Sequence, residues 1–220
     1  MAAKVKKKIL IVDDHPIFCL GMSELINKAD DLTVCGSADT HKQAVQAIVE
    51  LDPDLVIVDI SLKESSGIDL IQEINSRFQG LPMLVLSMYD ESLYAERALL
   101  AGARGYLMKQ EAISVAVDAI HQVLDGKLYA SDKVKEKVFQ RLVSPRTRTD
   151  ASPLDQLTGR ELEVFRFIGE GLSTREIAGR MKLSIKTIGT YRERIKEKLN
   201  LKHYTELVRV AVYWMQKQLK

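Results

Sequence analysis

Short apolar segments alternate with segments of helical periodicity from the N-terminus to Gly126, and this alternation constrains the fold more than any other feature. Three of the apolar segments are nearly continuous runs, as is typical of strands buried on both faces of a parallel sheet. The apolar segments are "ILIV" (9–12), "LTVCG" (32–36), "LVIV" (55–58), "MLVLS" (83–87) and "GYLM" (105–108). The helical segments cover residues 16–29, 41–51, 67–78, 91–102 and 112–126. We therefore predict a doubly wound α/β domain with a five-stranded parallel sheet.

Polar residues follow four of the five predicted strands, at the point where each strand ends. Asp13 and Asp14 follow the first strand, Asp59 the third, Ser87 ends the fourth, and Lys109 follows the fifth. Functional groups of such sheets gather at the carboxyl ends of the strands. We therefore expect three carboxylates, a hydroxyl and an ammonium group at one edge of the sheet.

The predicted edge has the composition of a phosphoryl-transfer site. Three neighbouring carboxylates repel one another unless a cation joins them, and oxygen ligands at an open site favour Mg2+. Lys109 and Ser87 are suited to bind the oxygens of a phosphoryl group. Asp59 is the expected nucleophile because it stands alone on the central strand, and an aspartate can form an aspartyl phosphate. His15 has no partner at metal-ligand spacing and is interpreted as a helix-start residue.

The charge changes sign along the chain. Residues 1–155 contain 18 lysines and arginines against 23 aspartates and glutamates, whereas residues 156–220 contain 14 against 7. A basic second part suggests a polyanionic partner. We expect three regions: a domain over residues 1–128, a linker helix and flexible linker over 129–156, and a helical domain over 157–220. The linker "SPRTRTDASPLDQ" (144–156) contains two of the five prolines.

The helical domain has clear helix starts. "TGRE" (158–161) and "STRE" (173–176) are Ser/Thr-x-x-Glu capping boxes. The segment "MKLS" (181–184) predicts a tight turn into a basic helix, "IKTIGTYRERIKEKL" (185–199), and "YTELVRVAVYWMQKQL" (204–219) predicts a last helix.

The first 127 residues contain the motifs of a known domain. Asp13, Asp14, Asp59, Ser87, Tyr106 and Lys109, on the repeated strand–helix pattern, resemble the receiver domain of a two-component response regulator from residue 8 to about 127. The resemblance implies a flavodoxin-like sheet of order 2-1-3-4-5, and phosphoryl transfer to Asp59 from the phosphohistidine of a sensor histidine kinase. It also implies that Asp14 binds Mg2+ directly, Asp13 largely through water and Ser61 through its backbone carbonyl. Asp59 is the further expected metal residue.

The same resemblance implies a switch. Ser87 would bond to the phosphoryl group, and Tyr106 would turn inward to fill the space that Ser87 leaves. Many receivers have proline after the lysine and Met-Pro-Gly after the phosphoacceptor, where this chain has Gln110 and "ISLKESSG". The second difference bears on the lifetime of the phosphate.

Residues 157–202 resemble the LuxR-type helix-turn-helix of NarL/FixJ response regulators. The resemblance implies that helix 174–181 crosses the DNA backbone and helix 185–199 enters the major groove. Helix 158–169 would pack behind these two helices. Core positions are Ile177, Ala178, Ile188, Ile195 and Leu199. Candidate DNA contacts are Lys186, Thr187, Thr190, Tyr191, Arg192, Arg194 and Lys198. Gly189 costs the helix about 1 kcal/mol relative to alanine; it either removes a base-reading side chain or allows close approach to DNA.

The last helix has an apolar stripe that combines two roles. Part of it is domain core, and in the family the same helix supplies a symmetric dimer contact, for which the candidates are Val208, Ala211, Val212 and Met215. A homodimer formed on phosphorylation would bind paired half-sites.

These observations predict a cytoplasmic transcription regulator that accepts and slowly loses an aspartyl phosphate, and is not a turnover enzyme. Its expected partners are a sensor histidine kinase, double-stranded promoter DNA and RNA polymerase, with no membrane. An aspartate-nucleophile phosphatase is the enzyme alternative, but it needs an acid two residues after the nucleophile, where this chain has Ser61. A constitutive dimerisation domain in front of the DNA-binding domain is the third alternative.

Overall fold

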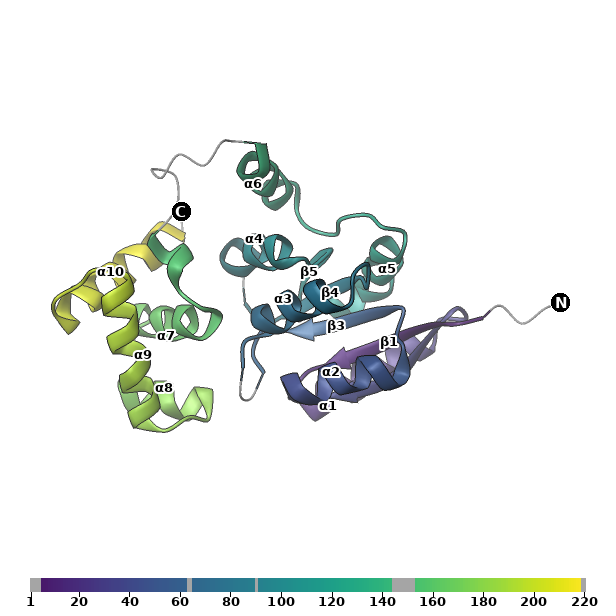
Figure 1. Ribbon diagram of the computed structural model, residues 1–220, viewed down its shortest axis with the longest axis horizontal. Coiled ribbons are helices and arrows are strands. Elements are labelled where there is room, and N and C mark those ends of the chain that lie inside the picture. The colour runs from purple at the N-terminus through teal and green to yellow at the C-terminus, as the bar shows by residue number, and fades with distance from the viewer. Residues whose placement is uncertain (1–4, 63–64, 90, 144–152, 219–220) are drawn as a thin grey trace. The chain divides into compact units, whose positions relative to one another are not determined.

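The computed structural model describes residues 5–62, 65–89, 91–143 and 153–218. It contains two compact units, Met1–Ser144 and Pro145–Lys220 (Figure 1). The expected flexible linker falls mainly on residues 144–152, which lie outside the described residues.

The first unit is built on a five-stranded parallel sheet, as the sequence predicts. Its strand order is β2-β1-β3-β4-β5 over the described residues. The strands are β1 Lys7–Val12, β2 Leu32–Ala38, β3 Leu55–Asp59, β4 Met83–Ser87 and β5 Gly105–Met108. The connecting helices are α1 Pro16–Asn27, α2 His41–Leu51, α3 Gly67–Arg77, α4 Glu91–Ala101 and α5 Ala112–Leu124. The doubly wound α/β prediction and the 2-1-3-4-5 order are confirmed.

Helices cover both faces of this sheet, which explains why its strands are continuously apolar. Every residue of β3 and β4 is buried. α1 and α5 pack together over one face, where Ile26 and Ile120 join Ile9 and Ile57 in a single apolar core. α2, α3 and α4 pack side by side and form the other layer (Figure 1). The inner strands β3 and β4 are therefore shielded from solvent along their whole length.

The segment after α5 extends the edge of the sheet. The Tyr129 amide donates a 2.9 Å hydrogen bond to the Arg104 carbonyl, and the Tyr106 amide donates a 2.8 Å bond to the Tyr129 carbonyl. α6 (Asp132–Val143) follows and packs against α4, with Val134 and Val138 buried. The helix that was predicted as part of the linker thus belongs to the first compact unit.

The second unit is all-helical within the described residues. A 3-10 helix, η1 (Pro153–Gln156), precedes four helices: α7 Gly159–Gly169, α8 Thr174–Met181, α9 Ile185–Lys198 and α10 Tyr204–Gln218. Both predicted capping boxes are present, at Thr158 and Ser173. Gly169 lets α7 approach α10 closely, because a Cβ at this position would lie 2.7 Å from the Ala211 carbonyl oxygen.

The buried residues of the second unit include Phe165, Ile177, Ile188, Ile195 and Leu207. Ile177 and Ile188 come from α8 and α9, which fixes these two helices against each other as in a helix-turn-helix.

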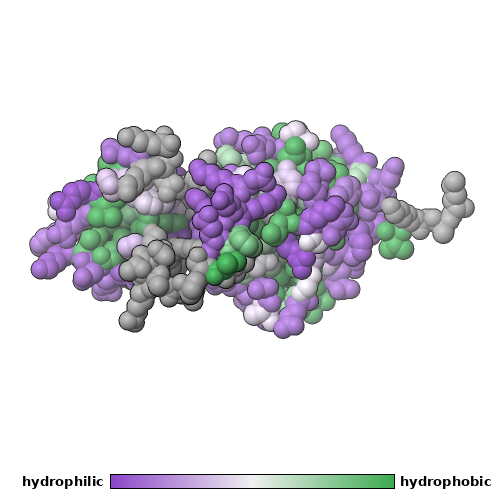
Figure 2. All heavy atoms as spheres, turned by 90° about the horizontal axis from the view of Figure 1, so that it is seen from above, coloured by the Kyte–Doolittle hydropathy of each residue, from purple (hydrophilic) through white to green (hydrophobic). Residues whose placement is uncertain are grey.

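In the space-filling view, hydrophilic side chains cover much of the visible face, with smaller apolar areas between them (Figure 2). None of the helices that the structure describes is both long and apolar enough to cross a membrane.

Candidate functional site

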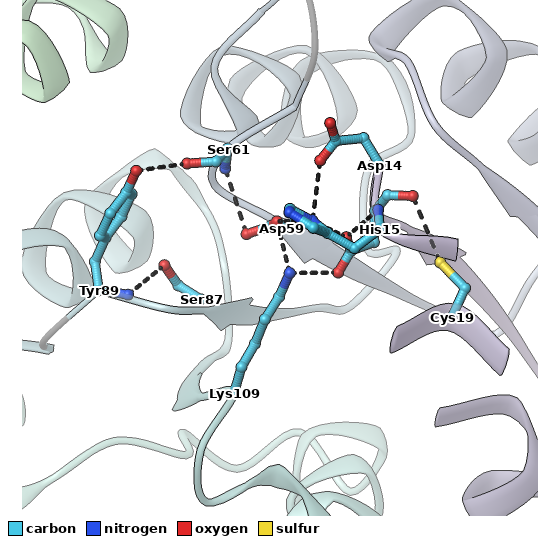
Figure 3. A network of polar contacts seen from close by, with 9 residues as sticks. Asp14, His15, Cys19, Asp59, Ser61, Ser87, Tyr89 and Lys109 are labelled. Atoms are coloured by element: carbon cyan, nitrogen blue, oxygen red, sulfur yellow. Dashed lines mark hydrogen bonds and ion pairs between the residues drawn. The ribbon is translucent and has the colours of Figure 1, made fainter. Parts of the chain in front are cut away.

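The structure brings the predicted carboxylates and the lysine together at the carboxyl edge of the sheet (Figure 3). Asp13 and Asp14 follow β1, and Asp59 is the last residue of β3. The Lys109 Nζ atom lies 2.6 Å from Asp13 Oδ2 and 2.7 Å from Asp59 Oδ2. All four side chains are buried. The lysine therefore supplies a positive charge that partly compensates these carboxylates.

Burial and charge oppose each other at Asp59. Loss of solvent raises the pKa of Asp59 to about 6, with Lys109 pulling the pKa down and Asp13 pushing it up. Burial lowers the pKa of Lys109, but the attraction of Asp59 and Asp13 outweighs burial and holds that pKa above its ordinary value. Lys109 is thus cationic at neutral pH. The ionised form of Asp59 is costly until a further cation joins the site.

His15 also lies at this site, although the sequence suggested only a helix-start role. Its Nδ1 atom is 3.0 Å from Asp13 Oδ1, 3.1 Å from Asp14 Oδ1 and 3.8 Å from Asp59 Oδ2. His15 is the N-cap residue of α1, yet its side chain makes no capping hydrogen bond. The only sequence signal for this position is its place directly after the two acids.

Tyr89 is a second residue that the sequence did not single out. Its amide donates a 3.1 Å bond to Ser87 Oγ, and its hydroxyl accepts a 2.9 Å bond from Ser61 Oγ (Figure 3). The Tyr106 hydroxyl donates a 2.8 Å bond to the Tyr89 carbonyl, and the Tyr89 ring stacks on Tyr94. Tyr89 therefore connects three of the predicted site residues, Ser61, Ser87 and Tyr106. Ser87 and Tyr106 are both buried.

The acidic edge has the donor set of a divalent-cation site. Asp13, Asp14, His15 and Asp59 each offer one ligand atom, and these atoms lie within 4.8 Å of one another. Carboxylate oxygens at this spacing fit a single hard cation such as Mg2+. The Ser61 amide lies 3.3 Å from Asp59 Oδ1, which places this loop beside the carboxylate.

The second unit presents one face of α9 to solvent. Lys186, Thr190 and Arg194 are exposed, and Thr187 and Tyr191 are half-buried. Together with Ser184 they line a surface depression of about 290 Å³. The two cationic side chains and the hydroxyl groups on this face are of the kinds that bind DNA phosphates and base edges.

Two of the candidate DNA contacts are held inside the second unit. The Arg192 guanidinium donates a 2.8 Å bond to Thr174 Oγ1 and lies 3.6 Å from the centre of the Tyr204 ring. Lys198 Nζ is 2.6 Å from Glu161 Oε2, in the capping box of α7. Arg192, which lies on α9, thus links this helix to α8 and α10, and Lys198 links α9 to α7.

The candidate dimer residues divide in a similar way. Ala211 is wholly buried against α7, so it belongs to the core of the domain. Val208, Val212 and Met215 are half-buried, and Met215 also lies against Gly169. Tyr213, which was not among the candidates, is the large apolar residue of α10 that is most exposed among those described.

An α/β unit with acids and a lysine at its carboxyl edge, followed by a helix-turn-helix unit, defines a regulator with a regulatory input domain and a DNA-binding output domain. Residues 9–121 match the response regulator receiver domain, and residues 155–211 match the luxR family of bacterial regulatory proteins. The chain belongs to the two-component response regulators of the NarL/FixJ type, and is a DNA-binding transcription regulator.

Similar proteins support this membership over nearly the whole chain. The oxygen regulatory protein NreC of Staphylococcus carnosus (strain TM300) is 33% identical over 210 residues, covering 93% of this chain and 96% of that protein. The response regulator GacA of Pseudomonas aeruginosa is 30% identical over 205 residues, covering 93% and 95%. The structure of the RcsB response regulator of Salmonella typhimurium has a TM-score of 0.55 at 25% identity, covering 93% and 97%. A LuxR-family two-component response regulator from Aurantimonas sp. SI85-9A1 has a TM-score of 0.57 at 29% identity, covering 63% and 99%.

Proposed function

We propose that Asp59 accepts a phosphoryl group from the phosphohistidine of a sensor histidine kinase, and that the resulting aspartyl phosphate favours binding of the C-terminal domain to promoter DNA. The observation that carries this proposal is the buried Asp13–Lys109–Asp59 arrangement, with Lys109 Nζ at 2.6 and 2.7 Å from the two carboxylates. A buried lysine between two acids is suited to hold a transferred phosphoryl group beside the carboxylate that receives it.

In the proposed transfer, a carboxylate oxygen of Asp59 forms a bond to phosphorus while the phosphorus–nitrogen bond of phosphohistidine breaks. The electron pair of that bond stays with the imidazole of the kinase. Lys109 remains protonated and neutralises a phosphoryl oxygen. Asp14 and Asp59, with the Ser61 carbonyl and with Asp13 acting through water, would hold Mg2+, which supplies charge neutralisation when bound.

The hydrogen bonds around Tyr89 supply a route for the switch. Ser87 accepts the Tyr89 amide, and a phosphoryl group on Asp59 offers the Ser87 hydroxyl a charged acceptor. A movement of Ser87 shifts the Tyr89 backbone, whose carbonyl is bonded to the Tyr106 hydroxyl. The Tyr106 amide is in turn bonded to Tyr129, at the start of the segment that leads into α6. The local charge change therefore reaches the connection to the DNA-binding domain.

For the output step, we propose that α9 enters the major groove of promoter DNA. Lys186, Thr187, Thr190, Tyr191 and Arg194 are the proposed contacts, because they lie on the exposed or half-buried face. Phosphorylation would free the C-terminal domain to form a homodimer through α10, with RNA polymerase as a further partner. Both DNA and the kinase's phosphohistidine are reached from the cytoplasm, where the proposal places the protein.

The test is the intact mass of the full chain after incubation with acetyl phosphate and Mg2+. We expect a gain of ~80 Da, corresponding to one phosphoryl group, that Asp59→Asn abolishes. DNA selected by the phosphorylated protein should then bind it more tightly than the unphosphorylated protein. Absence of the adduct overturns the phosphoryl step. If the adduct forms but phosphorylated and unphosphorylated protein bind DNA equally tightly, the first domain would instead be a constitutive dimerisation module.

A further inference from the structure

We infer that His15 is a direct nitrogen ligand of the divalent cation at the acidic edge, which makes this a mixed nitrogen–oxygen site for transition-metal ions such as Mn2+. The inference rests on the proposed cation site and adds a ligand and a metal class to it. Its basis is the position of the imidazole, whose Nδ1 atom faces two carboxylates at 3.0 and 3.1 Å.

These distances match the spacing of ligands around one ion. Neighbouring ligands of an octahedral ion with bonds of ~2.1 Å lie about 3.0 Å apart. The 3.1 Å separation of His15 Nδ1 from Asp14 Oδ1 is therefore that of adjacent ligands. Asp59 Oδ2, at 3.8 Å from the same nitrogen, lies in the range between adjacent and opposite positions. A cation can join His15, Asp14 and Asp59 with small side-chain movements, with Asp13 acting through water.

The two oxygens of Asp13 have different roles. Oδ2 lies against the Lys109 ammonium, at 2.6 Å, whereas Oδ1 faces His15. A cation on the His15 side therefore does not compete for the Asp13 oxygen that pairs with lysine, whereas Asp59 Oδ2, 2.7 Å from Lys109 Nζ, would be shared between the lysine and the cation. His15 is also held in place by its own backbone, because its amide donates a 2.9 Å bond to Asp13 Oδ1 and Pro16 begins α1 directly afterwards.

The imidazole is accessible as well as close. The His15 side chain is 54% exposed while the carboxylates are almost fully buried, so an ion from solvent meets the imidazole first. A ligand nitrogen must present its lone pair to the metal, so a direct bond to a cation would form through unprotonated Nδ1.

A nitrogen ligand changes which ions the site prefers. Mg2+ binds carboxylates and keeps several waters, whereas imidazole suits transition-metal ions, and Mn2+ accepts both kinds of ligand. His15 therefore adds little to Mg2+ binding and strengthens the binding of Mn2+.

The test is pulsed electron paramagnetic resonance of Mn2+ bound to the full chain, at fixed pH. We expect the strong nitrogen-14 coupling of a directly bound imidazole in the wild type, its loss in His15→Gln, and its retention in His41→Gln. His41 is a matched control because its imidazole pairs with Glu73 on α3, outside the acidic site. Calorimetric titration should show Mn2+ affinity lowered about tenfold or more in His15→Gln, with Mg2+ affinity little changed.

Two results would overturn the inference: no imidazole coupling in the wild type, or coupling that survives in His15→Gln. Phosphorylation of Asp59 with Mg2+, measured as the ~80 Da adduct on the same samples, separates this inference from the proposed function. A wild type that is phosphorylated but lacks nitrogen coupling refutes only the His15 assignment.

Discussion

The backbone amide of Tyr106 donates a 2.8 Å hydrogen bond to the carbonyl of Tyr129, across the edge of the sheet. Tyr106 is the predicted switch residue, and Tyr129 belongs to the segment that leads from α5 into α6. β5 and the start of the segment that leads into α6 are thus joined by a backbone hydrogen bond. If Tyr106 switches as proposed, a displacement of β5 is expected to act on this segment.

Replacing Tyr129 with proline should loosen this connection. The substitution removes the amide that donates to Arg104, so the edge pairing weakens. Hydrogen exchange of the Tyr106 amide should accelerate roughly fivefold to tenfold, as expected for the loss of one hydrogen bond. Tyr129→Phe keeps the amide and is the matched control. If Tyr129→Pro leaves the ratio of phosphorylated to unphosphorylated DNA affinity unchanged, this segment does not transmit the switch.

The stability of the cation-free first unit should depend on pH through Asp59. Its pKa is raised from 3.8 to about 6 in the folded protein, mainly by burial, so the native state binds more protons than the unfolded state between these values. The stability contributed by protonated Asp59 is present below pH ~4 and is lost as pH rises to ~6. Relative to Asp59→Asn, the wild type should lose about 2–3 kcal/mol over this window.

Denaturant unfolding in the presence of a chelator measures that difference. Added Mg2+ should restore stability at pH 7 more than at pH 4, because the cation binds the ionised carboxylates. A wild-type minus Asp59→Asn difference that is constant from pH 4 to 7 would contradict a raised pKa.

Arg192 and Arg194 should respond differently to alanine substitution. Arg192→Ala removes the bond to Thr174 and the stacking on Tyr204, and should destabilise the second unit by about 1–2 kcal/mol. Arg194 is exposed, so Arg194→Ala should change stability by less than about 0.5 kcal/mol. It should instead weaken DNA binding and lower the slope of log K against log salt by about 0.9. Equal effects of both substitutions on the salt slope would place Arg192 on the DNA as well.

Gly67→Ala should disturb the phosphoacceptor position. A Cβ at Gly67 would lie 2.1 Å from the Asp59 backbone oxygen, so the start of α3 and the end of β3 would have to separate. We expect a loss of about 1–3 kcal/mol and slower phosphorylation by acetyl phosphate. Gly21→Ala, on an exposed face of α1 with no atom within 4 Å of the added methyl group, should instead stabilise the protein by about 0.5–1 kcal/mol. Unchanged phosphorylation of Gly67→Ala would show that this contact is not needed to position Asp59.

The sequence by itself determined the strands, the helices and the group at the carboxyl edge. Continuous apolar runs such as residues 55–58 are typical of strands covered on both faces, as in a parallel α/β sheet, and the structure buries all of β3. Because parallel strands end at one edge, Asp13, Asp59 and Lys109 meet although they are far apart in the chain. A capping box joins residues only three positions apart, so the starts of α7 and α8 could also be predicted from the sequence.

Only the tertiary structure decided which partners the individual side chains have. Tyr89 joins Ser61 to Tyr106, and Arg192 reaches Thr174, through contacts that no local pattern encodes. The imidazole of His15 turns toward the acids, and α6 packs on α4 where the sequence suggested a linker. Periodicity tells which face of an element is apolar, but a hydrogen bond forms at about 3 Å, and which groups come within that distance is set by how whole elements pack.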